Sequence, residues 1–264
     1  RRYMVIDWRA DHSLRLPRQD LSAEIGTPNA CTQGGCHADR PLQWSVDAYR
    51  RWYGQARRPH YGTTFAAARR GEPEAVAELV RLAGHPLQPP IVRATALELL
   101  ARYPGAEAAT AVRAAVAAGD PLIRHTAVSH LALADPAERA ALLAPLLSDP
   151  VKAVRLAALS MLAGVPRELL KSYQQEAFDR ALAEYRTAMA YSLDFASSGM
   201  NLGNLELSLG RPDEAERSYR LALAIDELFF PARMNLAVLL SGQGRNDEAE
   251  RELRAVLAAY PGNA

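Results

Sequence analysis

The chain has 264 residues, about twice the length of an ordinary domain, so two or three structural units are expected. Its 49% apolar and 23% charged residues lie near the averages for globular proteins and exclude wholesale disorder and fibrous repeats. The net charge of +1 conceals an asymmetry, because residues 1–71 hold 12 Arg and 6 acidic residues, whereas the remainder holds 19 basic and 24 acidic residues. An Arg-rich front without a nucleic-acid-binding motif, joined to an acidic rear that would repel phosphate, indicates no nucleic-acid partner.

No apolar run reaches the roughly 18 to 20 residues of a membrane-spanning helix, and the first residues do not form an export signal. The sequence therefore predicts a soluble chain without a membrane span. It begins at Arg1 rather than at a methionine, which suggests a processed or partial product.

Both cysteines lie in one short segment near the front, at Cys31 and Cys36, and His37 directly follows the second. The spacing C-x4-C-H is close to C-x-x-C-H, the attachment motif of c-type haem. In that motif two thiols form thioethers with the porphyrin and the His ligates the iron. Gly34 and Gly35 tolerate positive φ and would let the longer loop bulge.

The residue types alone leave other interpretations of this segment open. A disulfide between Cys31 and Cys36 would form in an oxidising compartment, but it gives His37 no role. A structural zinc site needs four ligands, so His37 and His12 would have to complete it. Unpaired cysteines without a function are the remaining alternative.

Two helices are expected around the cysteine motif. Thr27 as a cap and Pro28 in the first turn predict a short helix that leads into it. A second helix is predicted over residues 42–53. Its aromatic stripe would either line a porphyrin or form ordinary core, and its residues are Trp44, Ala48, Tyr49, Trp52 and Tyr53.

Three stretches at the front carry a family resemblance, namely residues 3–7 (YMVID), 11–21 (DHSLRLPRQDL) and 26–31 (GTPNAC). They resemble the C-terminal section of periplasmic multihaem c-type cytochromes that carry HEAT-like and tetratricopeptide repeats behind their haem domain. The resemblance is most specific over the first 60 residues, and the order of the repeats behind them agrees. The spacing C-x4-C-H departs from the C-x-x-C-H of the family.

The resemblance implies one covalently bound haem c, with Cys31 and Cys36 as the thioether residues and His37 as the proximal ligand of the iron. It also implies electron transfer to a redox partner protein or a neighbouring haem domain. A periplasmic or extracellular location follows from the haem, because covalent attachment in such cytochromes takes place after export.

A six-coordinate iron would need a second axial ligand. His12 is the first candidate, for this haem or a neighbouring one, because the family places a His at the matching position. His60 is the second candidate and Met4 the third. The alternative for each is a surface or capping residue.

Behind the front, the motif R-x-x-A-[LV] recurs with a period of 31 residues, beginning at Arg93, Arg124 and Arg155. A proline precedes each copy and would begin the second helix of a pair, at Pro90, Pro121 and Pro150. First helices are predicted at about residues 73–84, 105–118 and 136–147. The three resulting hairpins resemble short HEAT-like repeats.

From about residue 166 the period becomes 34. Small residues recur at Ala181, Ala215 and Ala249, and large ones at Tyr185, Tyr219 and Leu253. In the preceding helices, Leu202-Gly203 aligns with Leu236-Ala237 and Gly210 with Gly244, and Pro261 comes near the end. These are the close-packing, knob, turn and terminal positions of tetratricopeptide repeats. Two full repeats are predicted, after the second helix of an earlier, degenerate one.

The sequence thus predicts an all-α fold with a haem-binding segment over residues 1–58, HEAT-like repeats over 59–165 and tetratricopeptide repeats over 166–264, the repeats forming an α-solenoid. The preferred function is electron transfer by a multihaem cytochrome c, of which this chain carries one haem, with repeats that dock partner proteins or copies of the chain. The alternatives are a relay-haem part of a multihaem oxidoreductase, and a haem-free interaction scaffold stapled by a disulfide or zinc. No acid–base pair, phosphate loop or nucleophile constellation stands out, so a self-contained enzyme is not expected.

Overall fold

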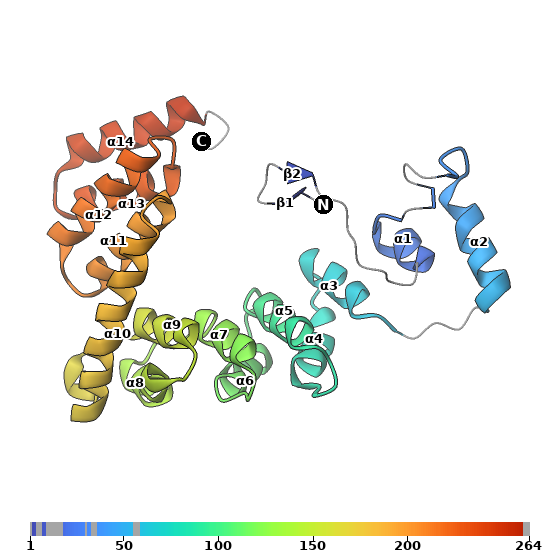
Figure 1. Cartoon of the computed structure of the whole chain (residues 1–264), viewed down its shortest axis with the longest axis horizontal. Helices are drawn as coiled ribbons and strands as arrows, with labels where there is room; N and C mark the ends of the chain where they lie inside the picture. The colour runs from blue at the N-terminus through green and yellow to red at the C-terminus, as the bar shows by residue number, and fades with distance from the viewer. Residues whose placement is uncertain are drawn as a thin grey trace.

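The computed structural model describes residues 2–3, 7–8, 18–29, 31–32, 36–54 and 59–260. From α3 (Tyr61–Arg69) onward, the described helices form one continuous array, which is a row of helical hairpins followed by a stack of longer helices (Figure 1). One cluster of buried apolar side chains extends from Phe65 to Leu205 and so joins the row to the stack. The helical character and the repeats confirm an α-solenoid.

The first described elements are two short strands, β1 (Arg2–Tyr3) and β2 (Asp7–Trp8), which pair antiparallel. Apart from these two-residue strands, the described elements are helical, in agreement with the predicted all-α fold. The sequence from Tyr3 to Trp8 is rich in aromatic and β-branched residues, which favour extended backbone over helix.

Two helices precede the array. They are α1 (Gln19–Ile25) and α2 (Leu42–Tyr53), and α2 has the bounds that the sequence predicts. The helix α1 packs against both α2 and α3. It thereby connects the front of the chain to the repeats.

Three helical hairpins follow with the 31-residue period. They consist of α4 (Ala75–Gly84) and α5 (Pro90–Leu100), of α6 (Ala106–Ala115) and α7 (Pro121–Ser129), and of α8 (Pro136–Leu143), the 3₁₀ turn η1 (Ala144–Ser148) and α9 (Lys152–Leu162). Pro90 and Pro121 occupy the first positions of α5 and α7, where a missing N–H breaks no helical hydrogen bond. Pro150 lies two residues before α9.

The repeated motif faces the core because α5, α7 and α9 pack side by side. Its last position is completely buried in every copy, at Leu97, Val128 and Leu159. The alanines before them, at Ala96, Ala127 and Ala158, are also completely buried and allow the helices to approach closely.

In the second and third copies of the motif, the arginine joins successive repeats. Nε and Nη2 of Arg124 donate to the Asp149 carboxylate at 2.8 and 3.1 Å, and Nη1 donates to the carbonyls of Ala118 and Gly119. In the next copy, Arg155 donates to Glu184 on the following helix at 2.9 and 2.6 Å. The second ion pair therefore joins the hairpins to the helical stack.

The stack begins after the 3₁₀ turn η2 (Arg167–Leu169). Its helices are α10 (Ser172–Tyr191), α11 (Ala196–Ser208), α12 (Pro212–Ile225), α13 (Phe230–Gly242) and α14 (Asn246–Ala259). The pairs α11 with α12 and α13 with α14 are the two complete hairpins of the 34-residue period, and α10 is the second helix of the degenerate one.

Close packing in the first complete hairpin depends on Gly203. A Cβ at this position would lie 2.5 Å from the ring of Tyr219, which is itself only 1% exposed. In the next hairpin, Ala237 corresponds to Gly203 and Leu253 corresponds to Tyr219. A leucine smaller than tyrosine thus accompanies an alanine larger than glycine. Glycine is thus required only where the knob is an aromatic ring.

Candidate functional site

The cysteine segment consists of turns rather than helix in its described residues. Asn29 Oδ1 accepts hydrogen bonds from the backbone N–H groups of Cys31 at 3.1 Å and of Thr32 at 3.0 Å. This side chain binds the N–H groups locally and stabilises a turn. The prediction of a short helix beginning after Thr27 is therefore wrong.

The structure brings the two predicted thioether residues and the predicted proximal ligand into one loop beside α2. Cys31 and Cys36 are not joined in a disulfide, and Cys36 and His37 are exposed. Cys31 is half-buried, and its Sγ accepts a hydrogen bond from Gln19 Nε2 at 3.4 Å. The backbone N–H of His37 donates to the Cys31 carbonyl at 3.2 Å, and its ring lies 4.6 Å from the ring of Trp44.

The candidates for a second axial ligand divide into two groups. His12 and Met4 lie outside the described residues. His60 is the N-cap of α3, where its Nδ1 accepts a hydrogen bond from the Gly62 N–H at 3.0 Å. This is the capping role that the sequence leaves as the alternative to iron ligation.

The aromatic stripe of α2 is buried only in part. Trp52 and Tyr53 are 74% and 68% exposed, whereas the buried side chains of this helix are Ser45, Val46 and Ala48. The interpretation of the stripe as core is therefore wrong for its last two rings, because helical spacing defines a face but not what covers it.

Within the described part of the chain, no group of three or more His, Cys, Asp or Glu side chains is arranged to hold a metal ion. None of the helices in that part combines the length and apolarity that crossing a membrane requires.

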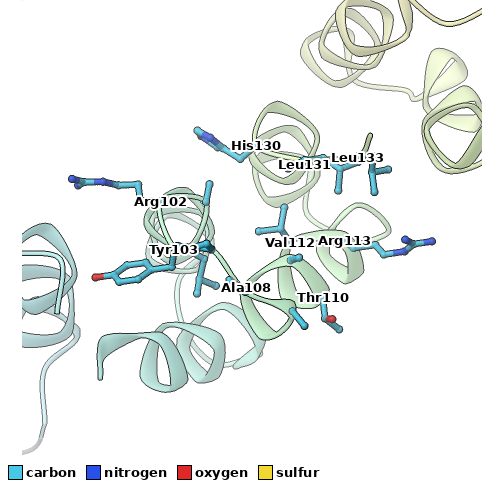
Figure 2. Close-up of a pocket in the computed structure, with 16 residues that line it drawn as sticks. Arg102, Tyr103, Ala108, Thr110, Val112, Arg113, His130, Leu131 and Leu133 are labelled. Carbon is cyan, nitrogen blue, oxygen red and sulfur yellow. The ribbon is translucent and has the colours of Figure 1, made fainter. Parts of the chain in front are cut away.

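A cavity of about 590 Å³ lies among the hairpins, between the C-terminal ends of α5 and α7 and the helix α6 (Figure 2). Ala108, Val112 and Leu131 give it an apolar lining. Arg102 and His130 extend on one side of it, and Arg113 extends on the other. Its lining includes no acidic side chain and no cysteine.

A smaller cavity, about 210 Å³, lies where the hairpins meet the stack and has a polar, uncharged lining. The lining residues are Ser160 of α9, Tyr185 of α10, and Asn201, Asn204, Leu205 and Ser208 of α11. Asn201 and Asn204 are exposed. Together with Asn235 of α13 they form a line of carboxamide side chains across two neighbouring helices, here called the amide row.

Hydrogen bonds fix the middle of the amide row. Asn204 Oδ1 accepts from the Tyr219 hydroxyl at 2.7 Å and from Asn235 Nδ2 at 2.8 Å. The hydroxyl of Tyr185 donates to the Asn201 carbonyl at 3.3 Å. Burial raises the pKa of both Tyr185 and Tyr219 above the ordinary value, so both hydroxyls remain protonated donors at neutral pH.

The repeat period contains a signal for this row. Asn235 follows Asn201 by 34 residues and therefore occupies the same place in the next repeat. Asn204 has no such counterpart, because Val238 stands at the corresponding position. Its place in the row becomes visible only through its contacts with Tyr219 and Asn235.

Comparison with known protein families identifies the repeats in the C-terminal part of the chain. Two family models of the tetratricopeptide repeat match, one over residues 172–228 and the other over residues 206–264. These residues consist of tetratricopeptide repeats, which confirms the prediction from the 34-residue period. The comparison with curated proteins and the comparison with solved structures each found no significant match.

Tetratricopeptide repeats are helical hairpins whose stacked surfaces bind other proteins. The matched residues include the whole amide row but not the cysteine segment. The functional class defined by the fold is therefore a protein-interaction array.

Proposed function

We propose that the chain is a protein-interaction scaffold whose tetratricopeptide repeats bind an extended peptide segment of a partner protein along the amide row. The observation that carries this proposal is the uncharged cavity beside Asn201 and Asn204, which combines carboxamide and hydroxyl groups on helices of a repeat array. This is the haem-free alternative among the functions predicted from the sequence.

Carboxamide side chains suit a peptide backbone because each offers both a donor and an acceptor. Asn204 Oδ1 already accepts two hydrogen bonds, so its remaining polar group is the Nδ2 donor. The exposed side chain of Asn201 offers both functions. A peptide carbonyl and a peptide N–H can therefore be bound without reference to the side chains of the partner.

The absence of charged side chains from the cavity lining limits the kind of peptide that can bind. No Lys or Arg lines it, so it lacks the cations that would bind a terminal carboxylate or a phosphate group. An internal segment of a partner fits better than a free C-terminus. Because Tyr219 and Asn235 hold Asn204 in place before binding, little conformational entropy is lost there on association.

Replacing Asn201 with Ala is expected to weaken peptide binding by about three- to tenfold, since one or two hydrogen bonds to the ligand are lost. The probe is a linear peptide with blocked ends, selected on the purified chain from a random peptide library. Its affinity for the chain and for Asn201→Ala is measured by isothermal titration calorimetry. The thermal midpoint of the variant should stay unchanged, because this side chain is exposed.

The matched control is Thr187→Ala, which removes an exposed polar side chain of α10 outside the cavity and should leave the affinity unchanged. If the library yields no peptide, or if Asn201→Ala binds the selected peptide as tightly as the unmodified chain, peptide recognition by the amide row is refuted.

As a second function we propose the attachment of haem c to the front of the chain. The observation in its favour is the loop that holds two unjoined cysteines and the exposed imidazole of His37 together. Cys31 and Cys36 would hold the porphyrin and His37 would ligate the iron, with His12 or His60 as the candidate second ligand. A bound haem would supply one-electron transfer, and the chain would then act in the periplasm or outside the cell.

Chain matured with a functional haem-attachment system should show c-type absorption bands, with one haem per chain in a pyridine haemochrome assay. Cys36→Ala should lose most of this haem, whereas Asn201→Ala, which lies in the repeats, should retain it. A shift of the oxidised spectrum in His12→Ala or His60→Ala would identify the second ligand. Absence of visible bands in the matured protein would refute the proposal and leave the scaffold function intact.

A further inference from the structure

The cavity beside α6 differs in its chemistry from the amide row. Its volume is about 590 Å³, and it lies between the loop that joins α5 to α6 and the loop that follows α7 (Figure 2). Ligand cavities of proteins commonly measure about 300–1,000 Å³ and combine an apolar lining with a few polar groups. We call this space in the middle of the array the loop cavity.

Small side chains on α6 leave room in the loop cavity. The helix lines it with Ala108 and Val112. The residues 31 positions later, at the corresponding places of α8, are Arg139 and Leu143. Arg139 is used within its own repeat, because its Nη2 donates to the Leu133 carbonyl. A repeat of this kind therefore holds a much larger group at this place than the alanine of α6.

The walls of the loop cavity are held in place by the rest of the array. The Tyr103 hydroxyl lies within hydrogen-bond distance of the carbonyls of Ala68 and Glu72, at 2.9 and 3.1 Å, and so fixes the loop after α5. Leu100 and Leu131, which also line the cavity, are buried in the main apolar cluster. Little conformational entropy would therefore be lost from these walls when a ligand binds.

The ionisable side chains that line the apolar part of the cavity are basic. Arg102 and His130 extend on one side of it and Arg113 on the other (Figure 2). Arg113 pairs with Glu138, whereas Arg102 is exposed and pairs with no carboxylate in the described part of the chain. An anion on the side of Arg102 would therefore meet an available cation, and no acid in the lining would repel it.

From these features we infer that the loop cavity binds a small aliphatic monocarboxylate, with its hydrocarbon chain against Ala108, Val112 and Leu131 and its carboxylate at Arg102. The apolar lining suits a hydrocarbon chain because burial removes that chain from water. A guanidinium suits a carboxylate because it can donate two parallel hydrogen bonds. The site is separate from the amide row, so this inference does not depend on peptide binding there.

The test uses decanoate as the probe, titrated into the full chain in an isothermal titration calorimeter. Saturable binding to one site per chain is expected, with a dissociation constant of roughly 0.1–1 mM for a ligand of this size. Decyltrimethylammonium carries the same hydrocarbon chain with the opposite charge. It should bind roughly tenfold more weakly or less, because the charged groups of the lining are cations.

Two variants locate the bound ligand. Arg102→Ala should weaken decanoate binding by roughly three- to tenfold, because it removes the cation and leaves the apolar lining intact. Ala108→Leu fills part of the cavity and should weaken binding by roughly tenfold or more. Circular dichroism verifies that each variant is folded, and Arg102→Ala should fold in any case because this side chain is exposed.

The matched control is Arg251→Ala, which removes an exposed arginine of α14 outside the cavity and should leave decanoate binding unchanged. Absence of saturable decanoate binding, or equal binding by Arg102→Ala and the unmodified chain, would overturn the inference. Equal affinity for decyltrimethylammonium would do the same. A further arm uses N-acetyl-trileucine with a free carboxylate. If this peptide displaces decanoate and binds more tightly, the cavity takes the C-terminus of a peptide, and the inference is wrong.

Discussion

Replacing Arg124 with Ala is expected to lower the free energy of unfolding by about 3–5 kcal/mol, the usual cost of removing one partner of a buried ion pair. The side chains of Arg124 and Asp149 are only 12% and 4% exposed, and two hydrogen bonds join them between neighbouring repeats. Without the guanidinium, a buried carboxylate loses its counter-charge. Urea denaturation followed by circular dichroism measures the change.

The effect should depend on pH in a defined direction. Burial raises the pKa of Asp149, but hydrogen bonds from Arg124 and from the Val151 N–H outweigh this effect, so the pKa lies below the ordinary value. A lowered pKa in the folded state adds stability that is complete above the unfolded pKa of about 4 and is lost as the pH falls through the folded value. The difference between Arg124→Ala and the unmodified chain should therefore shrink in acid.

A matched control is Arg70→Ala, which removes an ion pair with Glu72 whose side chains are 55% and 44% exposed. Exposed pairs contribute little to stability because solvent and salt screen them, so this variant should unfold nearly as the unmodified chain does. Equal losses in the two variants would contradict a special role for the buried pair between the repeats.

Replacing Gly203 with Ala is expected to cost about 1–3 kcal/mol through overpacking. The added Cβ would lie 2.5 Å from the ring of Tyr219, and this ring is buried between helices and cannot move away freely. Thermal and urea unfolding of Gly203→Ala against the unmodified chain measure the cost.

The next hairpin supplies the compensating change. There an alanine, Ala237, faces a leucine, Leu253, so Gly203→Ala combined with Tyr219→Leu recreates a pair that the chain already uses. The double variant should lose less stability than the sum of its two single variants. Additive losses would mean that the glycine and the ring are not coupled.

Much of the array could be predicted from the sequence because its signals are local and repeated. The 31-residue period places Leu97, Val128 and Leu159 on one buried face, and the 34-residue period identifies the tetratricopeptide repeats. Prolines at the first positions of α5 and α7 define where these helices begin.

Features outside the repeats were less predictable. Residues 31 positions before and after Asp149 are Ala118 and Arg180, so no periodic signal marks the acid that pairs with Arg124. Near the cysteines, the Asn29 side chain binds the backbone N–H groups that a helix after Thr27 would require. Trp52 is 74% exposed, and helical spacing alone does not specify what covers the face on which it lies.

For the candidate site, only its general class, a protein-binding surface, could be predicted from the sequence. Repeat periodicity indicates an array that binds proteins, but the amide row depends on Asn204, and the same place in the next repeat is occupied by Val238. Contacts with Tyr219 and Asn235, 15 and 31 residues away, position Asn204 in the row.

The most direct test of the central claim, that the tetratricopeptide repeats recognise a partner peptide, is a nuclear magnetic resonance titration with the library-selected peptide. The side-chain amide signals of Asn201 and Asn204 should shift in proportion to the bound fraction, together with backbone signals of α11 and α13. Binding that leaves these amide signals unchanged while shifting signals elsewhere, for example in α2 or α6, would contradict the proposed function.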